Sequence, residues 1–381
     1  MPRTPSPDED DLDTIPPPQP VFYAEQALLG ALLLDPQRLG DVPGIDPDAF
    51  STAAHAALFA AVRSLPAPDP TQHAQNTKWL EEVLTAAREQ ARGLTASYLH
   101  SLIQICPWPR HAPAYGRMVE AEHARRRLRA AAEHLARTAR DRSLPHPVPT
   151  TLAEADSLAD VVDDLAARFP PHSSSLPRTT ALPPAIAPDD AEEAVDEERL
   201  LLATATAHPA DIEQMRWLTA DDFSHPLHAG LWQCLTALSG RGAPVDPVTV
   251  LWEAQQRGLL THGTEPKELL YLLGTPAGSP EHWGERILER SVLATAHQVA
   301  CRIEAFTDNP ATTPYQLVIG SRRALADLTA IRIRWQQATS PSPAPAPKAS
   351  VAVAARAGPR RPRTTVPARP VSGRPIVGRT L

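Results

Sequence analysis

The sequence predicts an all-α fold in which two tandem domains each consist of a helical globule followed by a helical hairpin. Ala and Leu carry most of the apolar composition and aromatic residues make up only 5% of the chain, which favours helices over strands. Apolar residues recur at helical spacing along most of the chain. A stretch of the first half is repeated in the second half, and 381 residues are enough for two domains of roughly 100–200 residues each.

The first helices follow an acidic, proline-rich segment, 1–20, which lacks apolar periodicity and is expected to be disordered. A helix is expected from Ala24, and it must end before Pro36 because proline cannot continue a helix interior. One face of this helix carries four leucines, Leu28, Leu29, Leu32 and Leu33. The next helix carries a second apolar stripe at core-facing spacing, formed by Leu58, Phe59, Val62 and Leu65.

Further helical patterns complete the first copy, which is expected to span 21–169. They cover about 77–92, 96–105, 113–141 and 151–169. The last two form the predicted hairpin, and Thr151 with Glu154 is a candidate capping box for its second helix.

A proline- and serine-rich stretch and the acidic run after it predict a linker over 170–194. The second copy is expected over 195–338, with hairpin helices at 281–306 and 314–335. Thr313 is placed as the N-cap of the last helix, with Pro314 at the first helical position. Residues 339–381 are rich in Pro and Arg and predict a disordered basic tail.

The internal repeat is visible residue by residue. Residues 46–65 align without gaps to 219–238, with seven identities in twenty positions, which is more than helical periodicity alone produces. The identical residues of the first copy are Asp48, Phe50, Ser51, His55, Ala56, Leu58 and Leu65. His55 and His228 occupy the same place, which favours a repeated structural role such as hydrogen bonding near a helix start.

Several classes of site and location are excluded by what the sequence lacks. Cys106, Cys234 and Cys301 are too few and too far apart for a disulfide framework or a CxxC metal site. No apolar run reaches the roughly 18 residues of a membrane span, and the start of the chain does not have the pattern of a signal peptide. We therefore expect a cytoplasmic protein.

No motif for catalysis is found. None of Lys78, Lys267 and Lys348 follows a glycine, so the Gly-Lys-[Ser/Thr] loop that binds nucleotide phosphates is missing. His225 and His228 have metal-ligand spacing but no third ligand near them. The sequence thus predicts no catalytic residue, no cofactor-binding residue, no cofactor and no metal ligand.

Two basic features are candidates for contact with phosphates. The first hairpin helix carries six arginines, Arg125, Arg126, Arg127, Arg129, Arg137 and Arg140. We expect them to pair with acids of 151–169, and binding of nucleic acid is the alternative. The basic tail contains the densest patch, with candidate nucleic-acid contacts at Arg356, Arg360, Arg361 and Arg363. A solubilising tail, or a tail bound to the acidic segment 189–198, is the alternative there.

The sequence resembles the amino-terminal domain of DnaB-type replicative helicases. The resemblance begins with Ala24-Glu25-Gln26, Leu28-Leu29-Gly30 and Leu33-Leu34-Asp35, and continues in copy 2 with LTADDFSHPLHAGLWQCL and Arg257-Gly258-Leu259-Leu260. It implies a small all-α unit whose helical hairpins pair subunits into a collar and which contacts primase. Copy 1 lacks the Gly-x-Pro-x-Asp segment of the family, and copy 2 lacks the early Gly. Only a 43-residue tail follows the second hairpin, so we expect no motor domain.

These observations predict a non-catalytic scaffold or adaptor of DNA replication whose two copies pair within one chain. The expected partner is the replicative helicase or primase, and no membrane contact is expected. Apolar hairpin residues are the predicted pairing surface, namely Leu128, Leu135, Leu158, Leu165, Ile287, Val292 and Val299. A nucleic-acid-binding protein that acts through its basic C-terminal tail is the alternative, and a helicase relic without a retained role is a third hypothesis.

Overall fold

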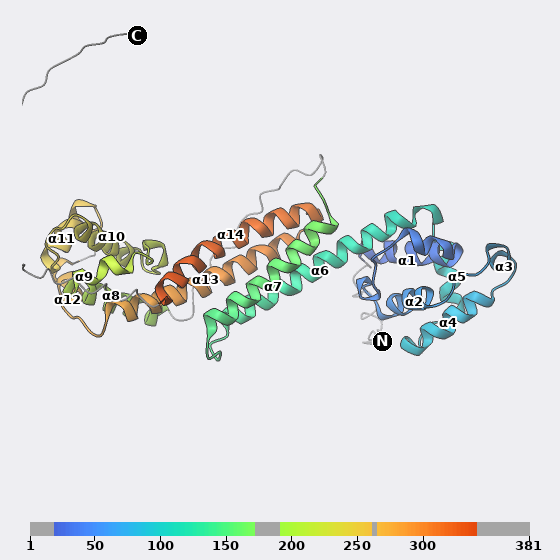
Figure 1. The fold of residues 1–381 in the computed structure, drawn as a ribbon, viewed down its shortest axis with the longest axis horizontal. Helices are drawn as coiled ribbons and strands as arrows, with labels where there is room; N and C mark the ends of the chain where they lie inside the picture. Colours follow the sequence, from blue (N-terminus) through green and yellow to red (C-terminus); the bar gives the residue numbers. More distant parts are fainter. Residues whose placement is uncertain (1–18, 172–190, 261–264, 341–381) are drawn as a thin grey trace, which may run out of the picture. The chain divides into compact units, whose positions relative to one another are not determined.

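The structure is a computed structural model that describes residues 19–171, 191–260 and 265–340 (Figure 1). Every regular element in these ranges is a helix, which confirms the predicted all-α fold class. None of the described helices combines the length and the apolar character that a bilayer-spanning segment needs. The tail arginines Arg356, Arg360, Arg361 and Arg363 lie outside the described residues.

The first copy starts with a globule of α-helices joined by short turns. These helices are α1 (Pro20–Leu34), α2 (Ala53–Ser64), α3 (Pro70–Gln75), α4 (Lys78–Gln90) and α5 (Ala96–Ile105), with 3-10 turns at Pro36–Asp41, Pro47–Ala49 and Pro109–His111. The leucine face predicted for the first helix forms the centre of their core, since Leu28, Leu29, Leu32 and Leu33 are at most 1% exposed. The hairpin of this copy follows as α6 (Ala112–Arg140) and α7 (Pro147–Arg168).

The second copy repeats this order. Its globule contains α8 (Ala191–Ala207), α9 (Pro209–Ile212), α10 (Pro226–Gly240), α11 (Pro247–Gln256) and α12 (Pro266–Leu273), with 3-10 turns at Glu213–Met215 and Ala220–Asp222. Its hairpin consists of α13 (Pro280–Asp308) and α14 (Pro314–Thr339). The structure begins α8 at Ala191, within the segment that the sequence assigned to the linker, and Glu192 and Glu193 place negative charge in its first turn, where it stabilises a helix.

Many prolines of the described chain start helices instead of marking linkers. Pro20, Pro70, Pro147, Pro226, Pro247, Pro266, Pro280 and Pro314 each stand at the beginning of an α-helix. Proline is favoured there because its fixed φ suits the first turn and its missing N–H would have had no helical partner. At α14 the predicted cap is confirmed: the Thr313 hydroxyl accepts from the Gln316 amide, and Pro314 is the first helical residue.

The capping box predicted at Thr151 is wrong. Helix α7 begins at Pro147, so Thr151 lies inside the helix, where it is fully buried. Proline at the first position starts α7 one turn earlier than the Thr-x-x-Glu pattern suggested.

The hairpin helix α6 belongs to two cores. Its first half contributes Ala112 and Val119 to the core of the copy-1 globule. Its second half, from Ala124 onward, joins a different core that contains α7 and residues of the second copy. In Figure 1, α6 lies beside α7 and α13 in this second region, in agreement with their mutual contacts.

Candidate functional site

The hairpins of the two copies pack against each other, and this contact is the candidate functional site. The predicted pairing residues are Leu128, Leu135, Leu158, Leu165, Ile287, Val292 and Val299, and each is at most 1% exposed. All lie in the one apolar cluster that takes residues from α6, α7, α13 and α14. The same cluster also contains the core residues of the copy-2 globule. At Gly284, helix α13 packs on Met215 and Trp217 of that globule. Ile287 lies one turn further along α13, so we assign it to the contact with the globule and not to the contact between the hairpins.

Arg125 of α6 caps the end of α13. Its guanidinium donates to the carbonyl oxygens of Thr307 and Asn309, both at 2.9 Å, and to that of Thr312 at 2.5 Å. The last carbonyls of a helix have no helical partner and carry partial negative charge, so a cation that donates hydrogen bonds is favourable there. Four residues further along α6, Arg129 donates to Asp308 at 2.6 Å. The end of α13 is therefore held by two arginines of the other copy.

The second helices of the hairpins are also joined by charged groups. Arg332 of α14 donates to the Asp156 carboxylate and to the Leu152 carbonyl of α7, both at 2.7 Å. Arg322 donates to Asp163 of α7 at 2.6 Å. These pairs are exposed, and exposed pairs contribute little to stability, but they fix the register of α7 against α14.

The prediction that the arginines of α6 pair with the acids of the adjacent helix is mostly wrong. Arg127 does contact Asp164 of α7, at 3.4 Å. Arg125 and Arg129 instead contact α13, and Arg126 donates to the Ala49 carbonyl of its own globule at 2.6 Å. Two acids of α7, Asp156 and Asp163, pair instead with Arg332 and Arg322 of α14.

Each globule contains a cluster in which a buried Glu and a buried His are joined by hydrogen bonds to an exposed Ser. In copy 1, Glu25 accepts from the Ser51 amide (2.7 Å), the Ser51 hydroxyl (2.9 Å) and His55 Nδ1 (2.6 Å). His55 Nε2 lies 2.7 Å from the Tyr98 hydroxyl. The cluster ties α1 to the start of α2 and gives His55 the structural role predicted for it. Ser51 donates to the carboxylate and not to the imidazole, so it is not activated as a nucleophile.

The same cluster recurs in copy 2. Glu198 accepts from the Ser224 amide and hydroxyl, at 2.5 and 2.7 Å, and from His228 Nδ1 at 2.8 Å. Burial raises the pKa of Glu198, but hydrogen bonds from His228 and Ser224 outweigh it and hold the pKa below its ordinary value. Sequence reasoning missed both glutamates, and it placed Glu198 in an acidic run. The signal was present, since each glutamate precedes its serine and its histidine by the same intervals.

His225 and His228 lie with their ring centroids 4.5 Å apart. Within the part of the chain that the structure describes, no group of three or more potential metal ligands is found. His228 directs Nδ1 to Glu198, so one of its nitrogens is already occupied by the buried cluster.

Comparison with protein families finds two matches in the chain. The DnaB-like helicase N terminal domain matches residues 17–121 and 190–283, which together make up more than half of the chain. Each match ends in the first helix of a hairpin, within α6 and within α13. Comparisons with curated proteins and with solved structures find no match.

Proposed function

Because the chain belongs to the family of DnaB-like helicase N terminal domains, we propose that it is a non-catalytic scaffold or adaptor protein of DNA replication. Both matched segments are this domain, which is itself non-catalytic. The resemblance implies the replicative helicase or primase as the partner. The proposal also places the protein in the cytoplasm.

The contact between the hairpins is the observation that carries this proposal. In the family that the chain resembles, hairpins pair separate subunits into a collar. Here α6 and α7 of one copy share a buried core with α13 and α14 of the other. Covalent linkage raises the effective concentration of the two copies for each other, so even a weak contact is formed within the chain. The protein thus presents two collar-type domains as a fixed pair.

Charge favours pairing of copy 1 with copy 2 over pairing of two first copies. Arg129 of α6 meets Asp308 of α13. The repeat equivalent of Asp308 is Arg140, so a contact between two first copies would bring Arg129 against Arg140, two cations. The equivalent of Arg129 is His297, whose pKa is lowered by burial and by the nearby Arg140. An unfavourable alternative of this kind gives specificity to a contact.

Cutting the folded chain between its copies tests the pairing. A protease recognition sequence inserted within 172–190 allows the full-length protein to be cleaved after it has folded. We expect the two halves to co-elute on size exclusion, and the Leu158→Asp, Leu165→Asp variant to separate, because two charges would enter the shared core. The matched control places aspartates at the exposed Ala153 and Ser157 of the same helix. Halves that separate without any substitution would contradict intramolecular pairing.

Binding to purified partners tests the adaptor function itself. Full-length protein is immobilised, and the host's replicative helicase and primase are passed over it separately. We expect one of the two to bind, and binding to weaken in the variant whose hairpins are separated. If neither binds, the adaptor proposal is wrong even if the hairpins pair.

The second candidate function is nucleic-acid binding through the basic tail. Residues 339–381 contain eight basic residues and no acidic residue. A segment of this composition binds phosphates by release of counterions. Deleting 339–381 should abolish salt-sensitive binding to DNA, measured by fluorescence anisotropy. Unchanged binding after the deletion would remove the tail from consideration.

A further inference from the structure

Charged groups bind the globule of copy 2 to the first helix of its hairpin. Glu197 of α8 pairs with two arginines of α13, Arg286 at 3.1 Å and Arg290. The Glu197 side chain is only 9% exposed, so salt screens these pairs less than it screens pairs on the open surface. The start of α13 is therefore held against the copy-2 globule.

A second group of bonds reaches both helices of that hairpin. Asp222, whose side chain is fully buried, accepts from the Ser291 hydroxyl of α13 at 2.7 Å and from Arg334 of α14 at 2.5 Å. Arg334 also donates to the Trp217 carbonyl and to the Thr219 hydroxyl, both at 3.2 Å. The copy-2 globule thus cannot turn about one helix of its hairpin without breaking bonds to the other.

Copy 1 lacks these bonds. The residues that correspond to Glu197, Arg286, Arg290, Asp222 and Ser291 are Ala24, Met118, Glu122, Ala49 and His123. Arg168 of α7 corresponds to Arg334, but within the described chain its side chain makes no hydrogen bond or ion pair. The contacts that remain come from α6, where Arg126 donates to the Ala49 carbonyl at 2.6 Å and His123 lies 3.8 Å from the exposed Asp48. The copy-1 globule is therefore bonded to one helix of its hairpin, whereas the copy-2 globule is bonded to two.

The apolar core is also interrupted at this junction in copy 1. Val119 belongs to the core of the copy-1 globule, and Ala124 belongs to the core shared by the hairpins. Between them stands the half-buried Glu120. Copy 2 has the fully buried Leu288 at this position, and a single core extends from its globule into the hairpins.

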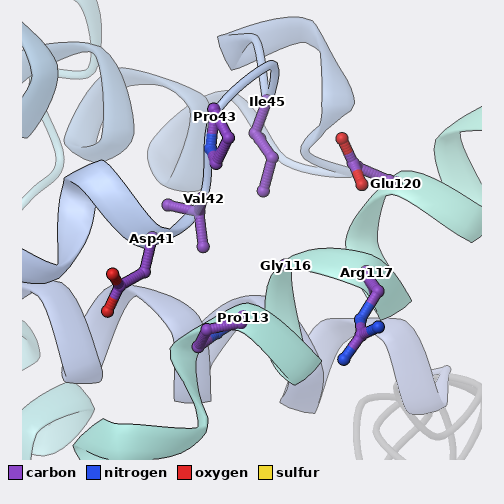
Figure 2. Close-up of a pocket in the computed structure, with 8 residues that line it drawn as sticks. All are labelled: Asp41, Val42, Pro43, Ile45, Pro113, Gly116, Arg117 and Glu120. Carbon is purple, nitrogen blue, oxygen red and sulfur yellow. The ribbon is translucent and has the colours of Figure 1, made fainter. Parts of the chain in front are cut away.

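The two halves of α6 are packed in different places. Val42 and Ile45 of the globule lie against the first half, where a Cβ added to Gly116 would lie 2.9 Å from Ile45 Cδ1 and 3.0 Å from Val42 Cγ1. In Figure 2 these two side chains point from their loop toward this part of α6, and Glu120 lies one turn beyond Gly116. The second half is held by the hairpins through Leu128, which is fully buried. The turn of α6 near Glu120 therefore joins two separately packed bodies.

We propose that α6 is a flexible arm near Glu120, about which the copy-1 globule changes its orientation relative to the paired hairpins, whereas the copy-2 globule is fixed to them. Units of one chain move relative to each other unless a large apolar interface joins them. A long helix can curve with only slight lengthening of its hydrogen bonds, so this motion needs no break in α6. The protein then offers its partners one fixed and one adjustable globule. This inference goes beyond the adaptor function, and it does not depend on which partner binds.

Distances between spin labels on the full-length protein, measured by double electron–electron resonance, test this inference. One protein carries labels at Glu89→Cys of α4 and Ser157→Cys of α7, and a second carries them at the corresponding positions of copy 2, Gln256→Cys of α11 and Arg323→Cys of α14. All four positions are exposed, and Cys301→Ala removes the partly exposed native thiol. We expect a broad distribution of distances for the copy-1 pair and a narrow one for the copy-2 pair.

Restoring one of the missing bonds tests its cause. Ala24→Glu combined with Met118→Arg places in copy 1 the pair that Glu197 and Arg286 form in copy 2, and it should narrow the copy-1 distribution. Met118→Arg alone is the matched control, because it adds the same charge at an exposed position without the glutamate that would bind it to α1, and it should leave the distribution broad. Equal widths for the two copies in the protein without these substitutions, or an equally broad copy-1 distribution in the double variant, would overturn the inference.

Discussion

Replacing Arg125 with alanine removes the cap that copy 1 places on helix α13 of copy 2. The side chain is only 14% exposed and donates to three backbone carbonyls, those of Thr307, Asn309 and Thr312. A hydrogen bond that involves a charged group contributes about 1.5–3 kcal/mol. Three bonds that share one guanidinium are not additive, so we expect Arg125→Ala to lower the free energy of unfolding by about 2–4 kcal/mol.

Chemical denaturation followed by circular dichroism measures this loss, and Arg129→Ala is the matched control. Arg129 lies one turn away on the same helix, but it is 50% exposed and its partner Asp308 is 57% exposed. Exposed ion pairs contribute about 0.2–1 kcal/mol, so the control should change stability by no more than that. If the two substitutions lowered the free energy of unfolding by amounts within about 0.5 kcal/mol of each other, the reasoning that the Arg125 cap holds the hairpins together would be refuted.

Two further predictions concern the globules. Glu198→Ala should destabilise copy 2 by about 2–4 kcal/mol at neutral pH, because the buried His228 and the amide and hydroxyl of Ser224 lose their acceptor. Burial raises the pKa of Glu198, but its hydrogen bonds outweigh burial and hold the pKa below its ordinary value. The stabilisation that Glu198 contributes is therefore complete above the pKa of the carboxyl in the unfolded chain, and it is lost as pH falls through the lower pKa of the folded protein. Thermal unfolding of wild type and variant should therefore converge in acid, and a constant difference would contradict this. Gly30→Ala should cost about 1–3 kcal/mol in the same assay, because its Cβ would lie 2.2 Å from the Leu102 carbonyl oxygen. Gly40→Ala, with nothing within 4 Å, is the control, and equal effects would argue against close packing of α1 on α5.

The buried positions of the globules could be predicted because helical periodicity marks one face of each helix. Leu28 and Leu58 were assigned to the core from spacing alone, and both are fully buried. The helix boundaries were less predictable where two start signals compete. At α7, Pro147 and Thr151 are both plausible first-turn residues, and only packing of Thr151 into the core decides between them.

Partners of charged side chains could not be predicted. Arg125 has acids within reach along its own hairpin, and nothing in the sequence ranks them against the carbonyls at the end of α13. Long flexible side chains reach many partners, and their choice depends on which element lies nearest in space.

The sequence by itself determined the helical fold class, the repeat and the family, because composition, periodicity and residue identity are properties of the chain alone. The tertiary structure decided how the two copies meet. Arg125 against the end of α13, Arg332 against Asp156, and the shared apolar core of four helices join residues far apart in the sequence. Such contacts depend on the position of whole helices, so only the folded chain specifies them.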